Sequence, residues 1–197
     1  MEGIIITILI LVFSAILHEI AHGYVADKLG DPTARLMGRL TLNPIPHIDP
    51  IMSILLPIML IVLQFPMIFA AAKPVPVNPL MLREGRKDLA LVALAGPLTN
   101  LALALTAAGL IRLIGANPIL EAIIVINLSL GFLNLIPIPP LDGSKFFSIF
   151  FPVKALRTYY SFAPYGIFLL FALLSLTPLG EWLHLLILNT SNVLGVK

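Results

Sequence analysis

Long apolar runs constrain the fold of this chain more than any other feature of its sequence. A membrane-spanning helix needs about 20 mostly apolar residues, and four stretches reach or approach that length: 4–21, 51–72, 89–114 and 119–137. A fifth apolar region, 162–188, is divided by Pro178, Gly180 and Glu181. Hydrophobic residues make up 59% of the chain and charged residues only 11%, unlike a soluble domain. The sequence therefore predicts an all-α polytopic membrane protein with about four to six membrane segments.

The 197 residues leave little room for a separate soluble domain beside these segments. We expect one membrane domain over 1–197, with a catalytic core at about 4–145 and C-terminal membrane segments at about 146–191. The first run is expected to be a retained helix, because its lead-in carries Glu2 and lacks the basic residues of a signal peptide. The chain has no cysteine, which excludes thiolate zinc sites and cysteine catalysis. A net charge of +2 does not favour nucleic-acid binding.

Two histidines and a glutamate stand together at the end of the first apolar run, in the sequence HEIAH from His18 to His22. Residues i and i+4 of an α-helix leave the same face about 6 Å apart along the axis, so both imidazoles can bind one metal ion. Glu19 lies beside them, where a carboxylate can take a proton from metal-activated water. Ionisable groups inside a membrane helix are costly and usually functional. The pattern predicts a hydrolytic zinc site that still needs a third protein ligand.

The third ligand must be an Asp, Glu or His that can reach the depth of His18 and His22. The candidates are His47, Asp49, Glu121, Asp142, Glu181 and His184. Asp142 follows the sequence NLIPIPPL, whose prolines end a membrane helix, and Gly143 then allows a tight turn. The same residues are also typical of an ordinary loop turn. Residue pattern alone therefore leaves Asp142 and the other candidates open.

Four short motifs together resemble those of the site-2 protease family, the intramembrane zinc metalloproteases, in its compact form without PDZ or CBS domains. The motifs are HEIAHG, AKPVPVNP, LAGPLTN and NLIPIPPLDG, and the resemblance covers about residues 13–143. It implies that His18, His22 and Asp142 bind one Zn²⁺ per chain and that Glu19 is the catalytic base. It also implies hydrolysis of peptide bonds within or near transmembrane segments of other proteins in the lipid bilayer.

Two asparagines of these motifs, Asn134 and Asn100, are implied by the resemblance to contact the substrate backbone or the developing oxyanion. An ordinary interhelical hydrogen bond is the alternative for each of them. Two other functions are compatible with the zinc motif itself. A zinc transporter would need further ligands along a path through the bilayer, for which the sequence offers only Glu121 near the opposite face. An inactive relative that binds membrane helices would not need Glu19.

The site also restricts the membrane topology, because its two halves must lie at one depth. We therefore predict an even number of crossings between His22 and residue 89, with 51–72 either re-entrant or paired with a second returning segment. Arg112 then lies on one side of the membrane, and the other side carries Lys28, Arg35, Arg39, Lys73, Arg83, Arg86, Lys87, Lys145, Lys154 and Arg157. By the positive-inside rule the basic side is cytoplasmic. We expect a multi-pass cell-membrane protein with its N-terminus outside and its active site near the cytoplasmic face.

Three remaining segments carry weaker patterns. Alternating leucines in the polar segment 31–44 predict a small β-hairpin or an extended edge, with an ordered loop as the alternative. The proline-rich segment 73–79 is expected to be an extended spacer. The apolar region 162–188 is expected to cross the membrane once and continue along the interface near Trp182, or to cross twice in short segments.

Overall fold

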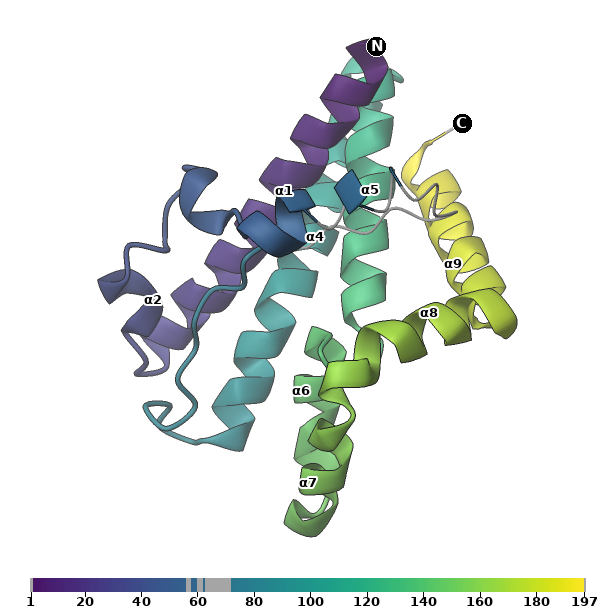
Figure 1. Ribbon diagram of the computed structural model, residues 1–197. Helices are drawn as coiled ribbons and strands as arrows, with labels where there is room; N and C mark the ends of the chain where they lie inside the picture. The colour runs from purple at the N-terminus through teal and green to yellow at the C-terminus, as the bar shows by residue number, and fades with distance from the viewer. Residues whose placement is uncertain (1, 56–57, 60–61, 63–71, 197) are drawn as a thin grey trace.

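The computed structural model describes residues 2–55, 58–59, 62 and 72–196 of the chain. Its longer helices are α1 (Glu2–Lys28), α4 (Arg86–Ile114), α5 (Pro118–Asn134), α8 (Gly166–Leu176) and α9 (Leu179–Leu194). Its shorter helical elements are α2 (Thr33–Leu36), η1 (Ile45–His47), η2 (Pro50–Leu55), α6 (Asp142–Phe147), η3 (Ser148–Phe150), α7 (Val153–Ser161) and η4 (Ala163–Tyr165). Helices dominate these residues and no strand occurs among them, which confirms the all-α class (Figure 1).

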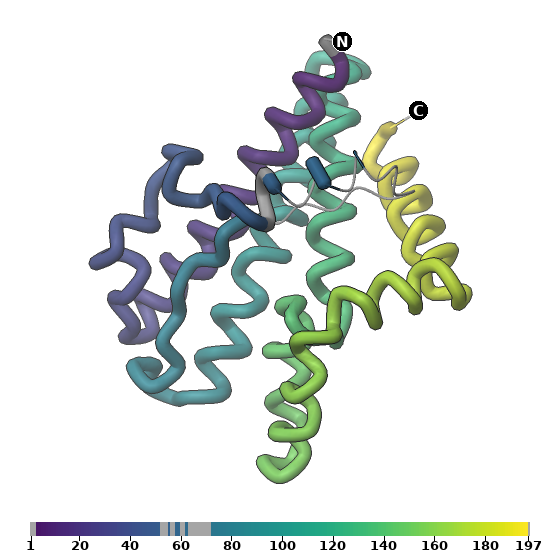
Figure 2. Tube along the Cα trace, viewed as in Figure 1, coloured from purple at the N-terminus to yellow at the C-terminus, as the bar shows by residue number. Residues whose placement is uncertain are grey.

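The helices α1, α4 and α5 pack against one another and form the centre of the fold (Figures 1 and 2). The helix α4 runs antiparallel to both of its neighbours. In lipid there is little hydrophobic driving force between helices, so their association depends on close packing. Small side chains allow the helices to approach closely enough for such packing. The α4 residues buried against Ile124 and Leu128 of α5 follow this rule: Ala104, Ala107 and Ala108.

Among the described residues, three helical segments are long and apolar enough to span a membrane: Gly3–Lys28, Arg86–Ile114 and Val153–Leu176. The helix α5 is apolar but shorter, with 17 residues. Large hydrophobic side chains such as Ile4 and Leu113 are exposed, as side chains that face lipid are. This chain is therefore a membrane protein. The predicted segment 51–72 lies mostly outside the described residues, so its path stays a prediction.

Both halves of the predicted site are brought to one end of the helix bundle. The chain leaves α1 through Gly30, whose φ of 111° lies in the left-handed region that favours glycine. It returns to the same place before α4 begins, since the Arg83 N–H donates to the Leu29 carbonyl at 3.2 Å. At the opposite end, α5 begins at Pro118 after Asn117, whose side chain caps the helix by accepting from the Ile119 N–H at 2.8 Å.

The predicted β-hairpin in segment 31–44 is wrong, because the described residues there form α2 and turns. The Asp31 side chain accepts from the Thr33 N–H at 3.0 Å and begins the turn that leads into α2. The Asn43 side chain likewise accepts from the Ile45 N–H at 3.1 Å at the start of η1. Such local hydrogen bonds compete with strand pairing. The alternating leucines share no face, since Leu36 is exposed while Leu40 packs beside Gly23 of α1.

Asp31 also connects the end of α1 to the segment that precedes α4. Its second oxygen, Oδ2, accepts from the Asn78 N–H at 2.6 Å. Burial opposes the charge of this carboxyl group, but the hydrogen bonds from Thr33 and Asn78 hold the pKa of Asp31 below its usual value. The segment around Asn78 is thus anchored to α1 by an ionised carboxylate at neutral pH.

The C-terminal third of the chain forms a second row of helices beside α5. The elements α6, η3 and α7 extend away from the end of α5, α8 runs from there outward to α9, and α9 runs back along α5 (Figure 1). Arg86 at the start of α4 joins this region to the bundle by donating to the carbonyls of Ser148, Ile149 and Phe151 at 2.8–3.0 Å. The arrangement places Asp142, the first residue of α6, next to the end of α1.

Candidate metal centre

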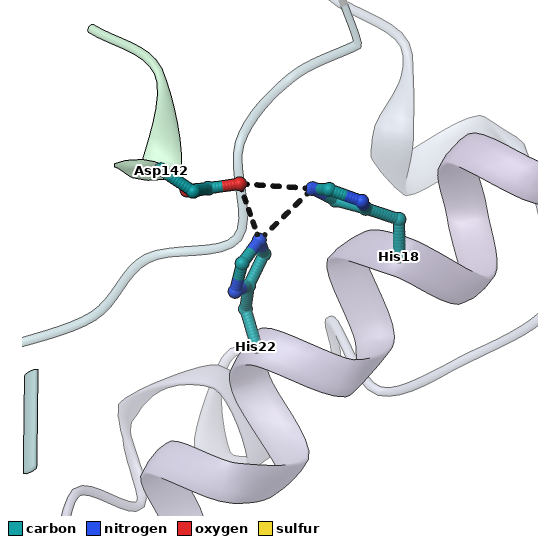
Figure 3. A group of neighbouring side chains, drawn as sticks. All are labelled: His18, His22 and Asp142. Atoms are coloured by element: carbon teal, nitrogen blue, oxygen red, sulfur yellow. Dashed lines mark hydrogen bonds and ion pairs between the residues drawn. The ribbon is translucent and has the colours of Figure 1, made fainter. Parts of the chain in front are cut away.

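Three buried side chains from two distant parts of the chain meet at one point (Figure 3). His18 and His22 are one turn apart on α1 and present their Nε2 atoms to each other at 3.0 Å. The Oδ2 atom of Asp142 lies 3.0 Å from each of these nitrogen atoms. Of the candidate third ligands, all of which lie in the described part of the chain, Asp142 is the one that joins the two histidines.

The outer nitrogen atoms of both histidines face hydrogen-bond acceptors. The Nδ1 atom of His18 lies 2.5 Å from the side-chain oxygen of Asn100, and Nδ1 of His22 lies 2.6 Å from the Val92 carbonyl. Because an amide or carbonyl oxygen can only accept, each Nδ1 carries a proton. In the neutral imidazole this leaves the lone pair on Nε2, which is the tautomer that metal-bound histidines use.

This arrangement fits a zinc ion. Two neutral imidazole nitrogen atoms and a carboxylate oxygen at 3.0 Å from one another would repel unless a proton or a metal cation lay between them. Ligands about 2.0–2.1 Å from one tetrahedral zinc are separated by roughly 3.3 Å, close to the separation found here. Two imidazoles and one carboxylate are also a known ligand set of catalytic zinc, which keeps a fourth position open.

Gly96 of α4 allows the two histidines to occupy this position. A Cβ atom added at Gly96 would lie 2.5 Å from Nε2 of His18 and would also overlap Nε2 of His22. Both contacts are shorter than van der Waals distance, so any side chain at this position would displace the imidazoles. The absence of a side chain at residue 96 thus creates the space in which the three donor atoms meet.

Asp142 is positioned by the turn that follows α5. The next residue, Gly143, packs against the carbonyl of Leu135, where a Cβ would overlap that oxygen. Within α6, the ammonium group of Lys145 contacts the outer oxygen of Asp142, Oδ1, at 3.2 Å. This contact leaves Oδ2 directed at the two histidines and partly balances the charge of the carboxylate.

Glu19 is held from the other side by the segment expected to be a spacer. The backbone N–H of Val75 donates to Oε2 of Glu19 at 2.7 Å. Val75 is itself buried, and its side chain lies close to Gly23 of α1. The proline-rich segment is irregular, and it lies along the C-terminal half of α1, where its backbone fixes the orientation of the Glu19 carboxylate next to His18. The spacer interpretation missed this contact.

The asparagines of the sequence motifs occupy different places in the structure. Asn100 contacts His18 through Oδ1, and its Nδ2 donates to Oδ1 of Asn127 at 2.8 Å. Asn134 donates to the Leu130 carbonyl of its own helix at 2.9 Å, which uses one of its two N–H groups. A substrate contact for either residue stays a prediction. Asn127 is fully buried and was not predicted, because no motif in the sequence includes it.

Comparisons with known proteins agree with this geometry. The family model described as "Peptidase family M50" matches residues 109–176, which include α5 and Asp142. The chain is 36% identical over 195 residues to "Putative zinc metalloprotease YwhC" of Bacillus subtilis (strain 168), with 92% of this chain and 85% of that protein covered.

Other relatives are longer than this chain. "Putative zinc metalloprotease Rip2" of Mycobacterium tuberculosis is 36% identical over 137 residues, and the match covers 66% of this chain and 51% of Rip2. No solved structure matches the chain significantly. Because YwhC is matched along most of its length at this level of identity, the chain belongs to peptidase family M50 and is a zinc metalloprotease of the membrane.

Proposed function

We propose that this metalloprotease cleaves peptide bonds within or near transmembrane segments of other membrane proteins, using a catalytic core at about residues 4–145. The observation that carries the proposal is the meeting of Nε2 of His18, Nε2 of His22 and Oδ2 of Asp142 at 3.0 Å, beside a helix that is long and apolar enough to span the bilayer. A hydrolytic site beside such a helix would act on peptide bonds of membrane-embedded chains.

In this proposal His18, His22 and Asp142 are the zinc ligands. Bound zinc supplies Lewis-acid chemistry, since it acidifies water and polarises a carbonyl group. Glu19 acts as the general base that takes a proton from the attacking water and later delivers it to the leaving amine. The hydrogen bond from the Val75 N–H supports this role, because it keeps the Glu19 carboxylate in one orientation beside His18.

The substrate is proposed to be a transmembrane helix that unwinds locally before cleavage. A peptide bond inside a helix has its carbonyl engaged in a hydrogen bond, so the segment must become extended before water can attack it. Asn134 lies at the end of α5, near the turn that leads to Asp142, and has one N–H group beyond its bond to Leu130. We propose this N–H as a contact for the substrate backbone or for the oxyanion.

The proposal is tested by cleavage of a panel of model transmembrane helices in proteoliposomes by the wild type and by Glu19→Gln. We expect Glu19→Gln to retain zinc but to lose about 10²–10⁴-fold in cleavage rate, because a neutral amide cannot take the proton. Glu121→Gln, at the start of α5, is the matched control and should cleave normally. Normal cleavage by Glu19→Gln would contradict the proposed mechanism. Zinc transport into the vesicles without cleavage would instead favour the transporter function.

A further inference from the structure

A chain of buried polar side chains leads away from the candidate metal centre through all three central helices. It starts at His18 of α1, passes to Asn100 of α4 at 2.5 Å and continues to Asn127 of α5 at 2.8 Å. The Nδ2 group of Asn127 then donates to Oγ of Ser14 at 2.9 Å and to the Ile123 carbonyl at 2.9 Å. Both asparagines are 0% exposed, so their amide groups depend on these partners alone in a buried environment.

The Ile123 carbonyl, at the end of this row of hydrogen bonds, determines the direction of every bond in the row. The Ile123 carbonyl can only accept, so the amide of Asn127 must turn its NH₂ group toward that oxygen. Its Oδ1 atom then faces Asn100, which must donate with Nδ2. The Oδ1 atom of Asn100 is thereby directed at His18 and accepts from Nδ1. A backbone carbonyl of α5 thus selects the His18 tautomer that has its lone pair on Nε2.

Without this restriction Asn100 could bond to His18 in either of two orientations. If its amide were rotated by half a turn, the NH₂ group would face Nδ1 and the proton of His18 would move to Nε2. An Nε2–H group directed at His22 and Asp142 cannot bind a metal ion. The direction of the hydrogen bonds therefore decides whether His18 is ready to be a zinc ligand.

We propose that Asn127 is a positioning residue for the zinc site. Through its hydrogen bond with Asn100, it holds His18 in the tautomer that binds metal. This inference rests on the proposed ligand set of His18, His22 and Asp142. Asn127 itself touches no donor atom of the site. An alternative role is that of an ordinary polar contact that fastens α5 to α1 through Ser14.

The two roles are distinguished by measuring the effect of Asn127→Leu on zinc affinity in two backgrounds. An aspartate at position 100 has an acceptor oxygen at both positions, so it accepts from Nδ1 of His18 whichever way it is turned. In the Asn100→Asp background, Asn127 is no longer needed to select the tautomer. The Asn100–Asn127 bond is already absent there because an aspartate cannot donate, but the Asn127 bond to Ser14, which fastens α5 to α1, would still be lost.

The measurement is the dissociation constant of Zn²⁺, obtained by chelator competition on purified, metal-stripped protein in lipid nanodiscs. We expect Asn127→Leu to weaken zinc binding by about 10–100-fold in the otherwise unchanged chain and by less than about threefold in the Asn100→Asp background. Ser129→Ala is the matched control, because the Ser129 hydroxyl is also on α5 but donates only to the Val125 carbonyl of its own helix. Its zinc affinity should equal that of the wild type.

Thermal unfolding of the metal-free proteins checks that each variant folds, and Asn127→Ala replaces Asn127→Leu if the latter does not. An equal loss of zinc affinity in both backgrounds, or no loss in either, would overturn the positioning role and leave the ligand set intact. A wild type that binds no zinc would overturn the ligand set itself. Zinc binding that responds as expected in a protein that cleaves no substrate would contradict the proposed proteolysis alone.

Discussion

At the scale of single residues, the candidate metal centre depends on the lack of a side chain at Gly96 as well as on its three donor atoms. Gly96 is the point where α4 approaches the two histidines of α1, and it contributes no side chain to the space between them. A glycine in a helix interior costs about 0.5–1 kcal/mol relative to alanine. The close approach at Gly96 gives a physical reason for this unfavourable residue inside α4.

The substitution Gly96→Ala is expected to abolish tight zinc binding. The new methyl group would overlap the Nε2 atoms of His18 and His22, so we predict at least about a 100-fold weaker affinity for Zn²⁺. Gly109→Ala is the control on the same helix, because a Cβ at Gly109 meets no atom within 4 Å. Isothermal titration of the metal-stripped proteins measures both affinities. A Gly96→Ala protein that binds zinc as tightly as the Gly109→Ala protein would contradict this packing.

At the scale of elements, the irregular residues 72–79 before α4 support the candidate site alongside the helices. Arg39 donates to the carbonyls of Lys73 and Pro74 at 2.8 and 3.3 Å, and the Asn78 N–H donates to Asp31. These two attachments lie on either side of Val75, whose N–H holds Glu19. The segment is therefore a fixed support for the proposed catalytic base.

Replacement of Val75 by proline removes the N–H donor to Glu19 and should slow turnover without releasing zinc. A hydrogen bond to a charged group contributes about 1.5–3 kcal/mol, so we predict a fall in kcat of about 10–100-fold. Val75→Ala retains the N–H and should cleave at nearly the rate of the wild type. Steady-state cleavage and zinc content are measured on both variants. If Val75→Pro turns over at the rate of Val75→Ala, the hydrogen bond has no role in catalysis.

The sequence predicts those parts of the site whose geometry is local, and misses those that depend on packing between helices. The spacing of His18 and His22 predicts their common face, because four residues make about one helical turn. The choice of Asp142 needed the family resemblance, because the prolines and glycine around it are equally typical of an ordinary loop turn. Asn127 could not be predicted, since only the packing of α5 against α4 brings its amide to Asn100. The β-hairpin prediction failed because side-chain hydrogen bonds of Asp31 and Asn43 favour turns.

At the scale of the whole molecule, basic side chains gather at the end of the bundle that holds the candidate metal centre. Several of them also stabilise the fold there. Arg35 pairs with Asp27 at 2.9 Å, and Arg86 binds three carbonyls that follow α6. The loop between α4 and α5 lies at the other end (Figure 1). This charge distribution favours an orientation with the metal centre near the cytoplasm.

Single cysteines test this orientation cleanly, because the chain has none of its own. We predict that Ala116→Cys, in the exposed loop between α4 and α5, reacts with a membrane-impermeant maleimide added to intact cells. Leu80→Cys, at a residue 94% exposed before α4, should react only after the membrane is opened. Mass shifts on gels report the labelling. Labelling of Leu80→Cys alone in intact cells would reverse the orientation, and labelling of both would contradict a membrane crossing by α4.

Zinc content measured on purified wild type and single-ligand variants tests the proposed metal centre most directly. We predict about one zinc ion per wild-type chain and less than about a tenth of that in His18→Ala, His22→Ala and Asp142→Ala after dialysis against a weak chelator. His47→Ala is the control, because His47 is buried but bonds to the Thr41 carbonyl at 2.9 Å. It should retain zinc. Full zinc content in the Asp142→Ala protein, or loss of zinc from His47→Ala, would contradict the ligand set proposed here.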